Sequence, residues 1–236
     1  MSNFLRKSAS LAGLVLLVSA SQQLFGATIY DNSTSDLNTR FNPGTFQVGN
    51  EINFVGSERH ITNFSFEFWG TNTASPGNTT FAGSVFAEVR FYLNNGTNFN
   101  GYATPGTMFY DSGLFAVTTP TDRSTFVFSG ASDFLGGGVF IPGSATNFTW
   151  TVQFSGMGGT DSVGLDLYGP PAIGSNFSDY WENQGSGWAL KTNALSSTMS
   201  FGARLQADVP EPSSITISIL GGVGLFLALG RLRRKQ

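Results

Sequence analysis

The stretch from residue 85 to 93 reads VFAEVRFYL, and every second residue in it is apolar, beginning with Val85. Glu88, Arg90 and Tyr92 occupy positions in between. Because successive side chains of a strand point to opposite faces, this pattern predicts a β-strand with one buried face. Asn94-Asn95-Gly96-Thr97 follows, and Asn and Gly tolerate the positive φ of tight turns, so a tight turn is expected there.

The same period of two recurs along the chain, at residues 64–68, 126–128, 148–154, 163–167 and 199–205. A set of strands that are each buried on one face is what the antiparallel sheets of a sandwich require. No segment between residues 28 and 208 shows a convincing helical period. The sequence therefore predicts an all-β domain, a single antiparallel β-sandwich of jelly-roll-like layout.

Composition supports this fold class and excludes some functions. Aromatic residues make up 14% of the chain, there are 30 glycines, and only 11% of residues are charged. Aromatic residues suit pleated surfaces, and glycines mark the turns between strands. The chain has no cysteine, so its stability must come from burial rather than disulfides. Residues 28–208 hold 14 acidic against 6 basic residues, which argues against nucleic acid as a partner.

The first 27 residues have the layout of a secretion signal. Arg6 and Lys7 precede an apolar run from residue 11 to 20, which is short for a membrane span. Small residues around Ser19-Ala20-Ser21 offer a cleavage site, and a later cut near Gly26 or Ala27 is an alternative. A retained N-terminal anchor is the other interpretation of this segment.

The C-terminal residues 209–236 combine three features in a fixed order. A proline-containing motif comes first, then residues 214–230 without a charge, then a basic tail at residues 231–236. Seventeen helical residues extend roughly 26 Å, the lower limit for a transmembrane helix, and flanking basic residues stay cytoplasmic. The motif residues are Val209, Pro210, Glu211, Pro212 and Ser213, and the residues that set the topology are Arg231, Arg233, Arg234 and Lys235.

This segment resembles the PEP-CTERM sorting signal of Gram-negative envelope proteins, on Pro210-Glu211-Pro212, the apolar span and the basic tail. The resemblance implies processing by an exosortase-like enzyme, an inner-membrane-anchored precursor, and final placement in the cell envelope or extracellular matrix with contact to an exopolysaccharide. An ordinary C-terminal anchor after a proline-rich linker is the alternative. Residues 28–208 are loosely similar to the choice-of-anchor β domains that often precede such signals.

Candidate catalytic groups are sparse. His60 is the only histidine, and no Gly-x-Ser-x-Gly motif accompanies it, so a surface or edge-strand role is favoured over a catalytic triad. One histidine without cysteine makes a zinc site improbable. Nothing in the sequence pairs two carboxylates as a glycosidase requires, although seven were considered: Glu58, Glu67, Glu88, Asp161, Asp166, Asp179 and Glu182. A non-enzymatic protein is expected.

No cofactor is expected, although structural calcium is an alternative. The oxygen-rich segment from Asp31 to Asp36, together with Asp161 and Asp166 near glycine-rich turns, supplies ligand types that calcium binds. Asx turns explain the same residues without a metal.

The segment from Tyr168 to Trp188 is expected to be a long loop with a concentration of aromatic residues. Tyr180, Trp181 and Trp188 beside Asp179 could contact a glycan, since flat rings cover sugar C–H groups while polar groups bind hydroxyls. In the alternative interpretation, these rings close the open end of the sandwich. The expected function is structural or adhesive, and a carbohydrate-binding module using this loop is the second hypothesis.

Overall fold

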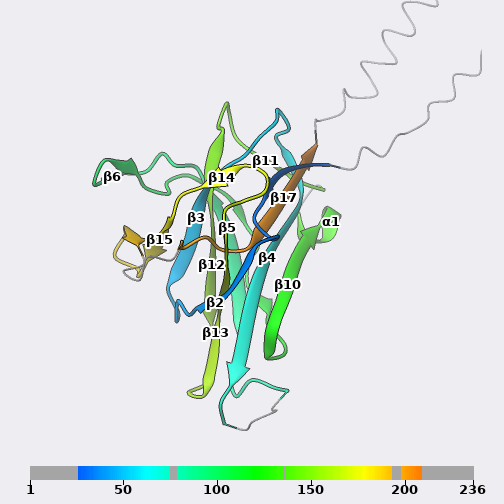
Figure 1. Ribbon diagram of the computed structural model, residues 1–236, viewed down its shortest axis with the longest axis vertical. Helices are drawn as coiled ribbons and strands as arrows, with labels where there is room; N and C mark the ends of the chain where they lie inside the picture. Colours follow the sequence, from blue (N-terminus) through cyan, green and yellow to red (C-terminus); the bar gives the residue numbers. More distant parts are fainter. Residues whose placement is uncertain (1–25, 75–78, 135–136, 193–197, 209–236) are drawn as a thin grey trace, which may run out of the picture.

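The computed structural model describes residues 26–74, 79–134, 137–192 and 198–208. It confirms the prediction of an all-β domain built from antiparallel sheets (Figure 1). The strands are β1 (Ala27–Asp31), β2 (Asp36–Phe41), β3 (Gln47–Asn53), β4 (His60–Asn72), β5 (Phe86–Tyr92), β6 (Asn98–Phe99), β7 (Tyr102–Ala103), β8 (Met108–Asp111), β9 (Phe115–Ala116), β10 (Thr121–Ser129), β11 (Val139–Phe140), β12 (Asn147–Ser155), β13 (Asp161–Tyr168), β14 (Ser175–Asn176), β15 (Asp179–Asn183), β16 (Trp188–Thr192) and β17 (Ala203–Asp208).

Two large sheets share these strands. The first, called here the β4 sheet, has the order β1-β17-β4-β13-β2, with β10 and β11 also paired to β4. The second, called the β12 sheet, has the order β16-β15-β3-β12-β5-β8, with β14 on β3 and β9 on β5. The 13-residue strand β4 is long enough to pair with β17 along one half and with β13 along the other. β4 therefore connects all parts of its sheet.

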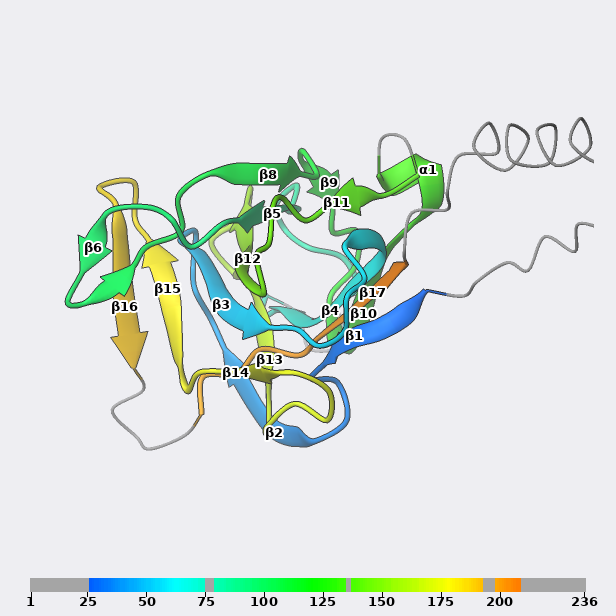
Figure 2. The same cartoon turned by 90° about the horizontal axis from the view of Figure 1, so that it is seen from above.

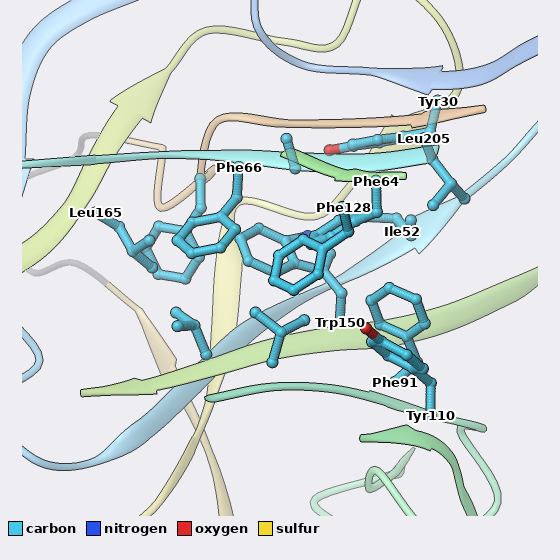
Figure 3. Packing of buried hydrophobic residues seen from close by; sticks show 14 of the residues in the cluster. Tyr30, Ile52, Phe64, Phe66, Phe91, Tyr110, Phe128, Trp150, Leu165 and Leu205 are labelled. Atoms are coloured by element: carbon cyan, nitrogen blue, oxygen red, sulfur yellow. The ribbon is translucent and has the colours of Figure 1, made fainter. Parts of the chain in front are cut away.

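The core lies between the two sheets and is dominated by aromatic rings (Figure 3). Phe64 of β4 packs on Trp150 of β12 at 5.4 Å and on Phe91 of β5 at 5.0 Å between ring centroids. The alternating residues that were expected to face inward are buried, among them Phe66, Val89, Phe148, Phe154, Leu165 and Leu205. The period of two thus identified the buried faces of β4, β5, β12, β13 and β17.

The tight turn predicted at residues 94–97 is wrong, because the chain reverses three residues later. Asn100 and Gly101 have φ of 52° and 94°, the left-handed region that a two-residue hairpin turn needs, and they connect β6 to β7. Asn94 instead uses its side chain to accept a hydrogen bond from Thr149 Oγ1 (2.6 Å). Gly96 N–H donates to Thr104 C=O, which extends the hairpin outward from the sheet.

The Tyr168–Trp188 segment is not a long loop, as was expected, because it contains β14 and β15. β15 pairs with both β3 and β16, so its two edges are occupied and both of its faces are covered. Tyr180, Trp181 and Glu182 are all buried, which removes the polar positions that would have marked a strand by alternation. One further difference is a single helical turn, α1 (Gly130–Asp133), where no helix was expected.

The two ends of the described domain lie together. β1 and β17 are antiparallel neighbours, and Ala27 is paired with Ala207 (upper right in Figure 1). β1 begins at Ala27, the last residue of the predicted leader, so a cut before residue 27 leaves this strand whole. Within the described ranges no helix is long and apolar enough to cross a bilayer, and the predicted span at residues 214–230 lies outside those ranges.

Candidate functional site

The predicted sorting residues lie outside the described part of the chain. This applies to the motif Val209, Pro210, Glu211, Pro212 and Ser213, and to the topology residues Arg231, Arg233, Arg234 and Lys235. The predicted leader is outside it as well, up to residue 25. These assignments stay predictions from the sequence.

The predicted glycan-contact residues do not form one exposed face. Tyr180 points into the core, where its ring packs on Phe41 at 5.0 Å and on Phe201 at 5.8 Å. Trp181 points to the opposite side of β15 and is only 1% exposed. A ring with so little exposed surface cannot stack on a sugar, so the structure disfavours Trp181 as a glycan contact.

Trp181 is part of a small second cluster on the outer face of the β12 sheet. The β6–β7 hairpin lies beside β15 and β16 (Figure 2), and Phe99 packs edge-on against Trp181 at 6.2 Å. The indole also interacts with the Glu51 carboxylate, which acts to lower the pKa of that carboxylate. Trp188 packs edge-on against Tyr92 at 5.5 Å between ring centroids. This placement agrees with the alternative interpretation, in which the aromatic residues close a surface of the sandwich.

Burial also affects the acidic residues of this cluster. It raises the pKa of Glu51, and the nearby charge of Asp179 raises it further, against the hydrogen bonds from Trp181 and Asn94. The pKa of Asp179 is raised by burial as well. Both shifts follow from partial burial, which disfavours the charged form of a carboxyl group.

His60 has the geometry of an edge residue. Its Nδ1 lies 2.7 Å from Asp208 Oδ1, and its ring stacks on Phe140 at 4.4 Å between centroids. On the other side of the ring, a Cβ placed on Gly138 would lie 2.2 Å from Nε2, so the backbone occupies the space that a nucleophilic serine would need. His60 therefore contacts β11 through Phe140 and β17 through Asp208, and it connects the ends of these strands in the β4 sheet.

The candidate calcium residues are engaged by the protein itself. Asp31 Oδ1 accepts hydrogen bonds from the N–H and hydroxyl of Ser33, and Asp36 Oδ1 accepts one from Asn38 N–H, as in Asx turns. Burial acts to raise the pKa of Asp161, but hydrogen bonds from the N–H groups of Ala82, Gly83 and Gly158 outweigh it and lower that pKa. In the part of the chain that the structure covers, no group of three acidic, histidine or cysteine residues could hold a metal.

The strongest candidate site is a hollow on the outer face of the β4 sheet, called here the Arg123 hollow. It encloses about 440 Å³, within the range of small-ligand pockets. β2, β10 and β13 supply its walls, with residues separated by up to 130 positions in the sequence. The lining residues are Asp36, Asn38, Arg40, Asp122, Arg123 and Asp166.

Arg123 stands at the centre of this hollow. Its Nη1 lies 2.7 Å from Asp36 Oδ2, and its Nε lies 3.9 Å from Glu67 Oε2 and 4.0 Å from Asp166 Oδ2. The remaining nitrogen, Nη2, donates to the Tyr168 hydroxyl, and the guanidinium carbon lies 5.1 Å from the centroid of the Tyr168 ring. These contacts from three strands fix the plane of the guanidinium.

Arg40 is held in a similar manner. Its guanidinium lies 5.4 Å from the centroid of the Trp69 ring, and Nη2 donates to the Asp122 carbonyl oxygen at 2.6 Å and to Asp122 Oδ1 at 3.3 Å. Each arginine of the hollow is therefore supported by an aromatic ring and oriented by an acidic residue.

Asp166 is the unusual member of the group. Its residue is 5% exposed, yet Oδ2 accepts no hydrogen bond from any described residue. Burial raises its pKa to about 6; Arg123 and Arg40 counteract this, while Asp36 and Glu67 add to it. An ionised carboxylate without a hydrogen bond in a buried position lowers the stability of the fold, so it requires an explanation other than folding.

We expect Asp166→Asn to raise the melting temperature at pH 7.5 by about 2–4 °C. The folded-state pKa lies above the unfolded value, so the folded state keeps the proton longer, and stability falls as pH rises from about 4 to about 6. The amide carries no charge and escapes this loss. Thermal unfolding followed by circular dichroism at pH 4.5 and 7.5 measures the difference, which should be clearly smaller at the lower pH.

The matched control is Asp111→Asn. Burial raises the pKa of Asp111, but hydrogen bonds from Gly113 N–H and Arg90 lower it overall, so its charge stabilises the fold at neutral pH. This substitution should lower the melting temperature at pH 7.5. Equal losses in both variants would contradict the special position assigned to Asp166.

A second hollow of about 580 Å³ lies where β8, α1 and β11 meet. Tyr110 in its wall donates its hydroxyl to the Asp133 carbonyl oxygen at 3.2 Å, and burial raises the pKa of Tyr110 to about 12. Arg90 binds the neighbouring Asp111 at 2.9 Å. These polar groups have partners, and no buried side-chain atom of the described residues lining this hollow lacks a hydrogen bond as Asp166 Oδ2 does, so it offers a ligand less than the Arg123 hollow does.

The sequence did not predict the Arg123 hollow. Glu67 and Asp166 were considered as glycosidase carboxylates, and Asp36 and Asp166 as calcium ligands, but Arg40 and Arg123 were not singled out, because no local motif links these residues. Their only signal is that each occupies an outward position of a strand, and the pairing of β2, β4, β10 and β13 is needed to bring them together. The chain matches no known family model, no curated protein and no solved structure.

Proposed function

We propose that this chain is an exported, non-enzymatic protein of the cell envelope or extracellular matrix, with a structural or adhesive role. Residues 209–213 would be the recognition motif of an exosortase-like enzyme, residues 214–230 the temporary membrane anchor, and the basic tail the cytoplasmic end. The motif begins one residue after β17 ends at Asp208, so it follows the folded domain without an intervening linker.

The observation that carries this proposal is the antiparallel pairing of β1 with β17. It places the entry and the exit of the domain side by side, so a leader and a sorting signal would both lie at one pole. The turn between β12 and β13 lies at the opposite end of the domain (Figure 1). A domain tethered at one pole in this way holds its far pole and both outer sheet faces away from the membrane.

We further infer that the domain is a single jelly-roll sandwich. Eight strands support this class: β2-β13-β4-β10 follow one another in the β4 sheet, and β3-β12-β5-β8 follow one another in the β12 sheet. Successive strands of this set alternate between the sheets, except that β5 and β8 are neighbours in one sheet, and this is the order that two interleaved Greek keys produce. A rigid domain without disulfides, stabilised by an aromatic core, suits a structural component outside the cell.

The second candidate function is a carbohydrate-binding module, now with a different surface. The burial of Tyr180 and Trp181 leaves only Trp188 and Asp179 half-exposed among the residues first considered. The Arg123 hollow is the more suitable place for a ligand, because polar side chains line it and the buried Asp166 Oδ2 accepts no hydrogen bond from any described residue.

Replacing Pro210, Glu211 and Pro212 together by alanine should leave the chain unprocessed in the membrane fraction of its host. The extended proline motif and its carboxylate would be missing, while the apolar span and basic tail would still insert. Immunoblots of membrane and extracellular fractions measure the distribution. The control replaces Pro170 and Pro171, and it should be processed normally; normal processing of the motif variant would refute the sorting proposal.

A further inference from the structure

The Arg123 hollow contains a buried hydrogen-bond acceptor that the protein does not use. The Asp166 side chain is 7% exposed and faces the hollow, and its Oδ2 has no hydrogen-bond partner among the described residues. Leaving a buried carboxylate oxygen unpaired costs stability, and buried polar groups in folded proteins are almost always satisfied. A ligand with a donor group would supply the missing bond.

The charges around the hollow restrict the kind of ligand. Three carboxylates and two guanidiniums line it, so an anion such as phosphate would meet a negative balance. A small cation would meet two arginines, and no described group of three acidic residues has the arrangement of a metal site. A neutral ligand remains.

The hollow offers both donors and acceptors. Arg40 and Arg123 donate, Asp36, Asp122 and Asp166 accept, and Asn38 can do both. A hydroxyl group donates to a carboxylate and accepts from a guanidinium through a single oxygen atom, whereas a neutral amide needs two separate atoms for the two bonds. Neighbouring hydroxyls on one ring would match neighbouring carboxylates and guanidiniums.

The donors are also fixed before a ligand arrives. Tyr168 lies under Arg123 and Trp69 under Arg40, and each arginine is tied to an aspartate on another strand. Side chains that are already ordered lose little conformational entropy on binding, which favours affinity in a polar site.

From these observations we propose that the Arg123 hollow binds a neutral saccharide, with Asp166 accepting a hydroxyl hydrogen bond and Arg40 and Arg123 donating to ring or hydroxyl oxygens. This deepens the adhesive role proposed above by naming a ligand class and a surface. It rests on that proposal only for the cellular location in which the protein would encounter the saccharide, because the hollow itself belongs to the described domain.

The test is binding of the full-length chain to an array of neutral gluco-, manno- and galacto-oligosaccharides, with uronic-acid oligosaccharides alongside. The chain is kept in a polyoxyethylene detergent, because glycoside detergents carry sugar headgroups that would compete. Arg123→Lys keeps the charge but loses the planar fork. Its matched control is Arg204→Lys on the same sheet, where the arginine side chain has similar exposure, 45% against 40%.

We expect the wild-type chain to bind at least one neutral oligosaccharide. Arg123→Lys and Asp166→Asn should each weaken this binding by about tenfold or more, since each removes a charged hydrogen-bonding partner. Arg204→Lys should leave it within about twofold. Asp122→Asn, at a side chain that is 96% exposed, should weaken binding without affecting folding. Loss of binding by Asp166→Asn together with a raised melting temperature would exclude unfolding as the cause.

Several results would overturn the inference: no neutral oligosaccharide bound, binding of uronic-acid oligosaccharides only, binding abolished by EDTA, or equal binding by wild type and the three hollow variants. The sorting proposal is tested separately from this inference. A negative array result would not change the processing expected of the alanine motif variant, and a chain that is never processed could still bind sugar on the array.

Discussion

Replacing Trp150 by alanine is expected to lower the free energy of unfolding by about 3–5 kcal/mol. Trp150 is fully buried at the centre of the core, and its ring contacts Phe64 at 5.4 Å, Phe66 at 6.0 Å and Phe201 at 6.3 Å. These partners lie on the opposite sheet and on the segment before β17, so the cavity would open where the two sheets meet (Figure 3). Rigid β-strands around it leave little room for collapse.

Trp150→Phe is the control, and we expect it to cost about 1–2 kcal/mol. The indole Nε1 has no hydrogen-bond partner among the described residues, so phenylalanine loses volume but no hydrogen bond. Urea unfolding of the purified chain, followed by circular dichroism, gives both values. A loss below about 1 kcal/mol for alanine would mean that the two sheets do not share one core.

Trp181→Ala is the second substitution with a large effect, and we expect it to lower the free energy of unfolding by about 3–4 kcal/mol. Trp181 is 1% exposed and packs against Phe99 of the β6–β7 hairpin. Its removal leaves a cavity on the outer face of the β12 sheet. The hairpin would lose its main apolar contact.

Trp188→Ala serves as the comparison, because Trp188 is only half-buried against Tyr92 and should cost about 1 kcal/mol. The pair also separates the two interpretations of the aromatic segment. Should Trp181→Ala leave stability unchanged and abolish saccharide binding, Trp181 would be a glycan contact and its placement beneath the hairpin would be wrong.

The strands that the sequence could predict are those with one buried face. β4 and β5 alternate between the core and an outer face, so apolar residues recur with a period of two. β12 keeps this period because the residues buried on its other face are polar, among them Thr149 and Thr151. β15 could not be found in this way, because Tyr180 enters the core while Trp181 is buried on the other face. Two adjacent aromatic residues break the period of two, so the sequence does not predict a strand there unless both faces of the strand are known to be covered.

The position of turns was only partly predictable, for a local reason. Asn95-Gly96 and Asn100-Gly101 are equally good candidates for a two-residue hairpin turn. The choice depends on contacts made outside the turn, since Asn94 is occupied by Thr149 and Gly96 pairs with Thr104. Such contacts are decided by the fold as a whole.

The Arg123 hollow illustrates what the sequence alone does not contain. Asp36, Glu67, Arg123 and Asp166 come from four strands, and only the strand order places them around one guanidinium. Each of these residues, considered alone, is an ordinary charged side chain on an exposed strand face. The sorting signal is the opposite case, because its three parts are contiguous in the chain and can be recognised without a fold.

Mass spectrometry of the mature protein, isolated from the envelope and medium of its own host, tests the central claim most directly. Processing at both ends predicts a chain that begins between residues 21 and 28 and ends close to Pro210-Glu211-Pro212, with β1 and β17 retained. Recovery of the intact chain from Met1 to Gln236 would contradict the account.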